Sequence, residues 1–325
     1  MIEVPDYIYE RSVIKQLYLK EESRHLFQKN AYSVSINREE RETGYFAEAS
    51  EVLSFKGEPV LKEPDLNEIL RKIMCAGGNL TELRAEIIFE GGFEETELRK
   101  FSSSLKKLAD KFEAQIKKVS VYLRESAEPE KTVFISGKGC LKKTSDAPWQ
   151  RQRIFEGQEI ILTGSVGKSG MIELFNKNKQ DLKKIYPDIY IEKMSNKSAD
   201  RLPYAEAETA PFYKVSAMLP LGPGGLMAGL WNLGEREETG FVIYADRIPY
   251  EQETIEISNH FNLNPLELNS EGAYLLATDR GEELTLALRS AGIDAVCIGE
   301  VTKDKKRVVM FEDEERYIES PRYKF

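Results

Sequence analysis

Cysteine and histidine are scarce in this chain. Its 325 residues include three cysteines and two histidines. Cys75, Cys140 and Cys297 are far apart, and none belongs to a CxxC pair. The sequence therefore indicates neither a disulfide framework nor a structural zinc site. His25 and His260 lie in helical patterns remote from any acid or thiol motif, so neither is favoured as a catalytic base or a metal ligand.

Long apolar runs and an excess of positive charge are also missing. No stretch approaches the roughly 18 apolar residues of a membrane-spanning helix, and the N-terminal segment carries acids early, unlike a secretory signal. The formal net charge is -9, which argues against non-specific nucleic-acid binding because such binding requires a basic surface. We therefore expect a cytoplasmic protein that binds small molecules or proteins, and neither nucleic acid nor membrane.

The chain does contain alternating strand and helix patterns. Apolar residues recur at spacings of three and four over residues 97–118, which predicts an amphipathic helix between strands at 83–92 and 119–125. The alternation returns after residue 150. Residues 159–186 read as a strand, a glycine-containing turn and a helix. Further helices are expected within 225–237, 250–261 and 281–291, and strands at 240–245, 273–278 and 294–302. We expect an α/β (α+β) fold in two lobes, residues 1–148 and 149–325.

The first glycine-rich segment is LTGSVGKSG, residues 162–170. Its Gly-Lys-Ser sequence is similar to the end of a P-loop, but Leu162 stands where that motif requires glycine, so an unrelated P-loop nucleotidase is the weakest interpretation. The simplest interpretation is a tight turn in which glycine supplies a positive φ. A backbone site for an anion, assisted by Lys168, remains the alternative.

The second glycine-rich segment is MLPLGPGGLMAGLWNLGE, residues 218–235. Glycine before an apolar helical pattern is typical of a loop that holds phosphate at a helix N-terminus. The segment has no acid, hydroxyl or base before Glu235. Packing alone explains its leucines at helical spacing.

Four segments resemble motifs of the AIR synthase (PurM-like) superfamily and occur in the same order as in that superfamily. Within it, the resemblance is strongest to the hydrogenase-maturation, HypE-like branch. They are residues 157–174, 216–241, 246–278 and 291–302. Fainter matches occur at residues 9–17 and 71–89. The resemblance implies an N-terminal lobe that pairs into a dimeric β-barrel, and an ATP site between the lobes. In the family, ATP activates an amide oxygen by phosphorylation, with Mg²⁺ held by carboxylates.

The acidic positions of this family are mostly occupied by other residues here. The replacements are Arg71 and Lys72 for an Asn-Asp pair, Tyr122–Ala127 for a GGxT strand end, Gln158 and Pro220 for two aspartates, and residues 29–42 with no GxDxA motif. The chain ends in PRYKF rather than in the cysteine of the HypE-like branch. Hydrogenase-maturation carboxamide chemistry is therefore not expected.

The sequence thus predicts a HypE-like protein that has lost Mg-ATP catalysis and acts as a binding or partner protein, either as a homodimer or with a paralogue. The alternative is an ATP-dependent enzyme with a remodelled site, and a small-molecule or nucleotide ligand stays open. No catalytic residue, metal ligand or cofactor is assigned, and ATP with magnesium is implied by the resemblance alone. The candidate cleft and anion-binding residues are Arg71, Lys72, Gly77, Gly78, Gly164, Gly167, Lys168, Gly170, Gly224, Gly225 and Glu271.

Overall fold

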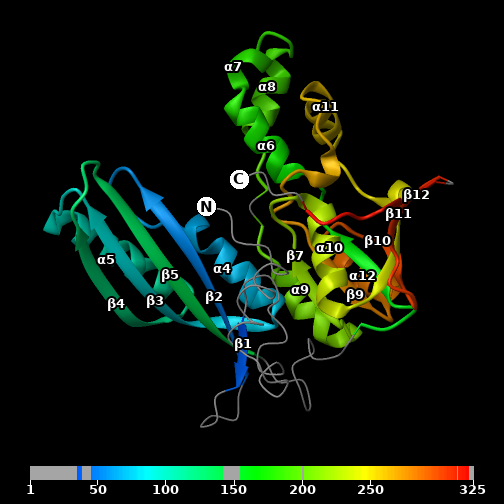
Figure 1. The fold of residues 1–325 in the computed structure, drawn as a ribbon, viewed down its shortest axis with the longest axis horizontal. Helices are drawn as coiled ribbons and strands as arrows, with labels where there is room; N and C mark the ends of the chain where they lie inside the picture. Colours follow the sequence, from blue (N-terminus) through cyan, green and yellow to red (C-terminus); the bar gives the residue numbers. More distant parts are fainter. Residues whose placement is uncertain (1–34, 39–44, 142–153, 200, 313, 322–325) are drawn as a thin grey trace. The chain divides into compact units, whose positions relative to one another are not determined.

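The computed structural model describes residues 35–38, 45–141, 154–199, 201–312 and 314–321 (Figure 1). The chain divides into two compact units, residues 1–148 and 149–325. Each unit combines one β-sheet with helices, so the architecture is mixed α/β. The faint family match at residues 9–17, His25 and most of residues 29–42 lie outside the described residues.

The N-terminal unit is built on a five-stranded sheet. Its strands are β1 (Ser35–Arg38), β2 (Tyr45–Phe55), β3 (Gly78–Glu90), β4 (Gln115–Arg124) and β5 (Glu130–Leu141), in the order β1-β2-β5-β3-β4. Strands β3 and β4 are parallel and are joined by helix α5 (Glu95–Lys111). The other neighbouring strands are antiparallel. The expected strand–helix–strand order is therefore present.

Helix α4 (Pro64–Cys75) packs closely on this sheet because two strand residues carry no side chain. Gly137 and Gly139 of β5 face Ile69 and Ile73 of the helix. A Cβ atom at Gly137 would lie 2.6 Å from a methyl carbon of Ile69, which is too close for two carbon atoms. The two glycines therefore let α4 lie directly on the backbone of β5.

Helix α5 is shorter than the helix predicted over residues 97–118, because it ends at Lys111. Glu113 adopts a left-handed φ of 54°, and the amide of Ala114 donates to the carbonyl of Ala109 at 2.8 Å. This bonding pattern stops a helix. Ile116, which the periodicity placed on the helix, lies in strand β4 and pairs with β3. The prediction was wrong there because the apolar spacing continued by chance into the next strand.

The C-terminal unit contains a seven-stranded sheet. Its strands are β6 (Glu159–Thr163), β7 (Ala217–Pro220), β8 (Gly240–Tyr244), β9 (Tyr274–Thr278), β10 (Ala295–Thr302), β11 (Arg307–Phe311) and β12 (Glu314–Tyr317), in the order β12-β11-β8-β10-β6-β9-β7. Only β8 and β11 pair in parallel within it. Strand β6, which lies between β10 and β9, is an apolar run whose last four residues are buried. A strand with neighbours on both edges and layers on both faces needs such a run.

Helices of the same unit lie between and beside these strands. They are α6 (Lys168–Lys177), α7 (Lys179–Leu182), α8 (Asp188–Ser195), α9 (Tyr204–Thr209), α10 (Gly225–Glu237), α11 (Gln252–His260) and α12 (Gly281–Ser290), with the 3-10 turns η3 (Ala210–Tyr213), η4 (Ala245–Arg247) and η5 (Pro265–Glu267). Helices α10, α11 and α12 lie in the ranges predicted for them, and the helix predicted within residues 159–186 is divided into α6 and α7. Within the described residues, no helix is long and apolar enough to cross a membrane.

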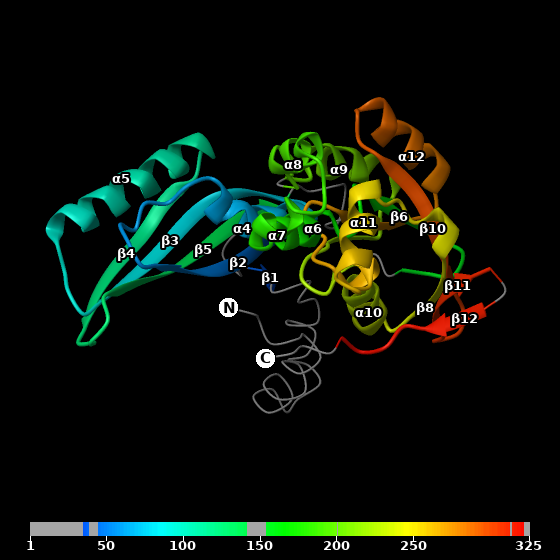
Figure 2. The ribbon, with the colours of Figure 1, turned by 90° about the horizontal axis from the view of Figure 1, so that it is seen from above.

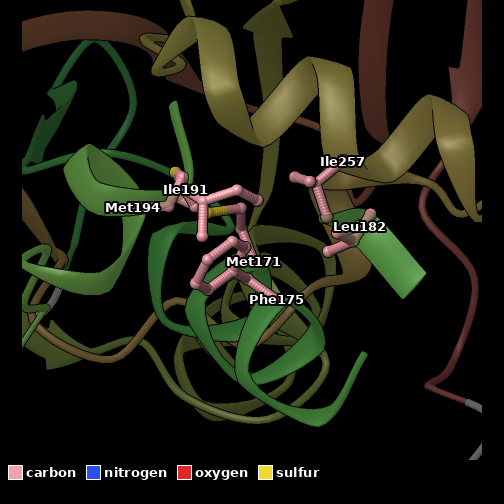
Figure 3. Close-up of a cluster of buried hydrophobic side chains, with 6 residues drawn as sticks. All are labelled: Met171, Phe175, Leu182, Ile191, Met194 and Ile257. Carbon is pink, nitrogen blue, oxygen red and sulfur yellow. The ribbon is translucent and has the colours of Figure 1, made fainter. Parts of the chain in front are cut away.

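Helices α6, α7, α8 and α11 stand together beyond the strands of their unit (Figure 1), and we call them the helical protrusion. They share a small core of their own, shown in Figure 3. Its buried members are Met171, Phe175, Leu182, Ile191, Met194 and Ile257. Short helices are marginal in water by themselves, so this core holds the protrusion together.

We expect Phe175→Ala to destabilise the C-terminal unit by about 3–5 kcal/mol, because it removes a fully buried aromatic ring and leaves a cavity. Urea unfolding monitored by circular dichroism measures the change. Phe212→Ala is the matched control, because the side chain of Phe212 is 75% exposed. A Phe175→Ala protein as stable as the control would show that the protrusion does not depend on this core.

Candidate functional site

Both glycine-rich segments turn directly into helices. Helix α6 begins after Gly167, whose φ is 72°, and helix α10 begins after Gly224, whose φ is 80°. Gly164 and Gly225 also have positive φ values. These are backbone conformations that glycine adopts without steric cost.

The two turns meet the same stretch of chain, residues 265–273, which we call the glycine-packed loop. A Cβ atom at Gly170 would lie 2.7 Å from the amide nitrogen of Asn269. One at Gly225 would lie 2.5 Å from the carbonyl oxygen of Leu268. Gly167 and Gly164 approach the backbone of the same loop, at its beginning and its end. The four glycines thus allow backbone to pack on backbone.

The amide groups around the start of α6 are bonded within the protein. The amide of Gly167 donates to the hydroxyl of Ser270 at 2.8 Å. The amide of Gly170 donates to the carbonyl of Asn269 at 2.8 Å, and that of Val166 to the carbonyl of Pro249 at 3.2 Å. A phosphate-binding loop instead aims such donors at its ligand. Three donors of this turn are therefore already used.

Lys168 makes an ion pair with Glu251. Its Nζ lies 2.9 Å from Glu251 Oε1, and the Nζ of Lys197 lies 2.5 Å from the other oxygen of that carboxylate. The charge that the sequence offers to an anion is thus compensated inside the protein.

Glu253 extends this ion-pair network. Lys193 lies 2.5 Å from it and Lys197 lies 3.3 Å from it. The hydrogen bond from Lys193, with help from Lys197, holds the pKa of Glu253 at about 2. The network therefore links the start of α6, the end of α8 and the start of α11 through alternating charges.

Gln158 and Pro220 occupy positions where the family resemblance places aspartates. Gln158 is buried; its Nε2 donates to Ser216 Oγ at 2.7 Å, and its Oε1 accepts from the amide of Phe155 at 3.3 Å. Pro220 is the last residue of β7 and pairs with Tyr274. Neither residue offers a carboxylate to Mg²⁺.

Glu271 lies in the glycine-packed loop near a second carboxylate, that of Glu173. The side-chain amide of Asn269 donates to Glu173 at 2.8 Å and to Glu271 at 3.4 Å. Ser169 also donates to Glu173, at 3.4 Å. Sequence reasoning missed Glu173, although its position four residues after Ser169 on one helix face gave a local signal.

A fully buried acid, Glu206, was also missed. It accepts a hydrogen bond from Thr163 at the end of β6 at 2.7 Å, and Arg201 lies 2.6 Å from it. Arg201 in turn donates to the carbonyl of Gly272 at 3.0 Å. Arg201 and Glu206 are near each other in the sequence, but their contacts with Thr163 and Gly272 join distant parts of the chain, which no local pattern could reveal. The pair ties the glycine-packed loop to helix α9.

The remaining candidates belong to the N-terminal unit. Arg71 and Lys72 lie at the end of α4, are each 4% exposed, and both approach Glu68 at 3.3 Å. Gly77, with a φ of 82°, turns the chain from α4 into β3, which starts at Gly78. The basic pair is therefore buried rather than displayed on the surface.

Metal binding gains no support from the side chains that the structure describes. Among those residues, no group of three or more histidine, cysteine, aspartate and glutamate side chains could hold a metal ion. The donor set around Gln158 and Pro220 does not suit Mg²⁺, which requires hard oxygen ligands and gains most from carboxylates.

Residues 156–312 match the family model of the AIR synthase related protein, C-terminal domain. Among curated proteins, the chain is similar to a hydrogenase expression/formation protein of Methanocaldococcus jannaschii. The two are 27% identical over 162 residues, which cover 48% of this chain and 45% of that protein. The match thus spans less than half of the relative's length.

Two solved structures share the fold. The structure of the HypE–HypF complex has a TM-score of 0.70 at 17% identity, and the alignment covers 96% of this chain and 99% of that chain. The hydrogenase maturation protein HypE in complex with ATP has a TM-score of 0.65 at 16% identity, with coverage of 97% and 95%. Likeness at this identity establishes the architecture.

We expect Gly225→Ala to destabilise the C-terminal unit by about 1–3 kcal/mol or more, because the new methyl group meets two carbonyl groups of the glycine-packed loop at a positive φ. Thermal and urea unfolding measure the loss. Gly222→Ala in the same segment is the control, since open space surrounds that position. Equal stability of the two variants would contradict the close packing.

Proposed function

Because residues 156–312 form an AIR synthase-related C-terminal domain and the whole chain has the PurM-like fold, we propose that this protein is a HypE-like protein without Mg-ATP catalysis. It acts through binding, as a partner of other proteins. The family and the α/β fold expected from the sequence are confirmed by these comparisons. The loss of catalysis is our inference from the residues of the candidate site.

The side chain of Gln158 carries this inference. An aspartate at this position would offer a metal two anionic oxygens, whereas the glutamine offers one neutral oxygen, which already accepts a backbone hydrogen bond. The nitrogen of the same amide is bonded to Ser216. Leaving the triphosphate and its Mg²⁺ without carboxylates removes the main means of neutralising their charge.

Lys168 and the turn around it support the same proposal. A lysine can replace a metal as counter-charge only if it is available to the phosphates, and Lys168 is already paired with Glu251. The amides of Gly167 and Gly170 are bonded to the glycine-packed loop. The turn thus serves as a packing element of the fold.

Titration calorimetry with Mg-ATP tests the proposal. We expect no binding heat for the wild-type protein at nucleotide concentrations up to the millimolar range. Micromolar affinity requires about 8 kcal/mol of binding free energy, which a site without carboxylates for Mg²⁺ does not supply. The HypE protein whose structure contains ATP is the positive control. Micromolar binding to this chain would overturn the proposed loss and favour an ATP-dependent enzyme with a remodelled site.

We also infer that the N-terminal unit pairs with a second copy of itself through the open face of its sheet. The register places Val52, Ile88, Tyr122 and Phe134 on one face. Figure 2 shows α5 along one side of this sheet, and the buried residues of β5, such as Val133, belong to the helix-covered face. Tyr122 and Phe134 are 49% and 43% exposed. Aromatic rings gathered on an open face favour burial against another protein surface.

The charges on this face suit a symmetric partner. A groove on it is lined by Arg84, Glu86, Lys118 and Phe134, among others. In a two-fold interface the same patch meets itself, so cations of one copy can face acids of the other. A homodimer therefore satisfies both the apolar and the charged groups, and a paralogue with the same face would do so as well.

We expect Phe134→Glu to convert the dimer into a monomer, because two carboxylates would be buried at the interface without partners. Sedimentation velocity measures the mass. Phe212→Glu, at a side chain that is 75% exposed in the C-terminal unit, should leave the dimer intact. A wild-type monomer at tens of micromolar would contradict the homodimer.

A further inference from the structure

The corner between α7 and α8 presents two large apolar side chains to solvent. Ile185 is 57% exposed and Ile189 is 78% exposed. They lie four residues apart, on either side of Pro187, at the start of α8. Single exposed isoleucines are ordinary on protein surfaces, but two at one helix corner form an apolar contact point.

Two tyrosines beside the isoleucines anchor this corner to the core of the helical protrusion. The rings of Tyr186 and Tyr190 stack with their centroids 4.5 Å apart, and both pack against the core of the helical protrusion. Isoleucine is β-branched and has few rotamers. Binding at this corner would therefore order few side chains, which lowers its entropic cost.

Four lysines precede or lie beside the two isoleucines in the sequence. We define the α7–α8 corner by the following residues: Lys177, Lys179, Lys183, Lys184, Ile185 and Ile189. The segment 177–189 holds these four lysines against two aspartates, in a chain whose formal net charge is -9. The corner is thus a basic site on an acidic protein.

Most of this positive charge is not neutralised nearby. Lys177 and Lys183 are exposed and make no ion pair with any residue that the structure describes. Lys179 lies 5.8 Å from the ring centroid of Phe175, and only Lys184 has an acidic partner, Asp181 at 2.7 Å. A ligand with carboxylates would find at least two uncompensated cations beside an apolar contact point.

We propose that the α7–α8 corner docks an acidic, amphipathic segment of a partner protein. Carboxylates of that segment pair with the lysines while its apolar side chains cover Ile185 and Ile189. An anionic membrane fits less well, because two isoleucines give only a small apolar anchor for a lipid surface. The inference rests on the proposed partner role and names the partner's chemistry.

Fluorescence anisotropy tests the docking without nucleotide. The probe is a fluorescein-labelled helical peptide of Glu-Leu-Leu-Glu repeats, and its counterpart carries lysine in place of glutamate. We expect the acidic peptide to bind and the basic one not to bind. The double variant Ile185→Ser/Ile189→Ser should raise the dissociation constant about tenfold or more, because the apolar contact is lost. Lys177→Glu/Lys183→Glu should weaken binding and reduce its dependence on salt.

Leu286→Ser is the matched control, because Leu286 is 58% exposed on α12, away from the corner residues in sequence. Its affinity should equal that of the wild type, and circular dichroism verifies that every variant is folded. Equal binding of both peptides, full binding by the double isoleucine variant, or binding to phosphatidylserine vesicles but not to the acidic peptide would each overturn the proposal. Binding of Mg-ATP in calorimetry would instead overturn the proposed loss of catalysis and leave this docking result standing.

Discussion

The close approach of three backbone segments, with no side chain between them, is the constraint on which the C-terminal unit depends. The turns before α6 and α10 both contact the glycine-packed loop through glycine. Side chains at these positions would push the two helices away from the loop. The loop leads directly into β9, which lies between β6 and the edge strand β7. The starts of two helices and one strand are therefore positioned together.

This constraint explains why the chain has glycine at these turns even though the neighbouring positions hold no aspartate. A glycine in such a turn serves the backbone whether or not phosphate lies nearby, whereas an aspartate at a buried position has a use only if a cation neutralises it. Gln158 satisfies its buried position with neutral hydrogen bonds to Ser216 and Phe155. The close packing of the backbone is thus independent of which polar side chains occupy the site.

The sequence was sufficient to predict the elements that local periodicity determines. Helix α10 spans the predicted residues, and strands β8 and β10 fall where β-branched residues cluster, whereas β9 is an apolar run with one β-branched residue. The boundary of α5 was not predictable from spacing, because a left-handed Glu113 ends the helix while apolar residues continue. The pairing of Lys168 with Glu251 and the hydrogen bond from Thr163 to Glu206 depend on tertiary contacts between distant segments. The glycines were recognisable as candidates, whereas the internal partners of their amides were not.

The ion-pair network between α6, α8 and α11 determines how the helical protrusion responds to acidic pH. A carboxyl whose pKa is lowered by folding stabilises the folded state. For Glu253 this stabilisation is complete above the unfolded pKa of about 4.5, and it is lost as pH falls through the folded pKa of about 2. Acidification to the levels of an endosome or a lysosome leaves that carboxylate ionised. Lys193 and Lys197 therefore keep their bonds to it, and α8 stays fastened to α11 across the acidity of ordinary cellular compartments.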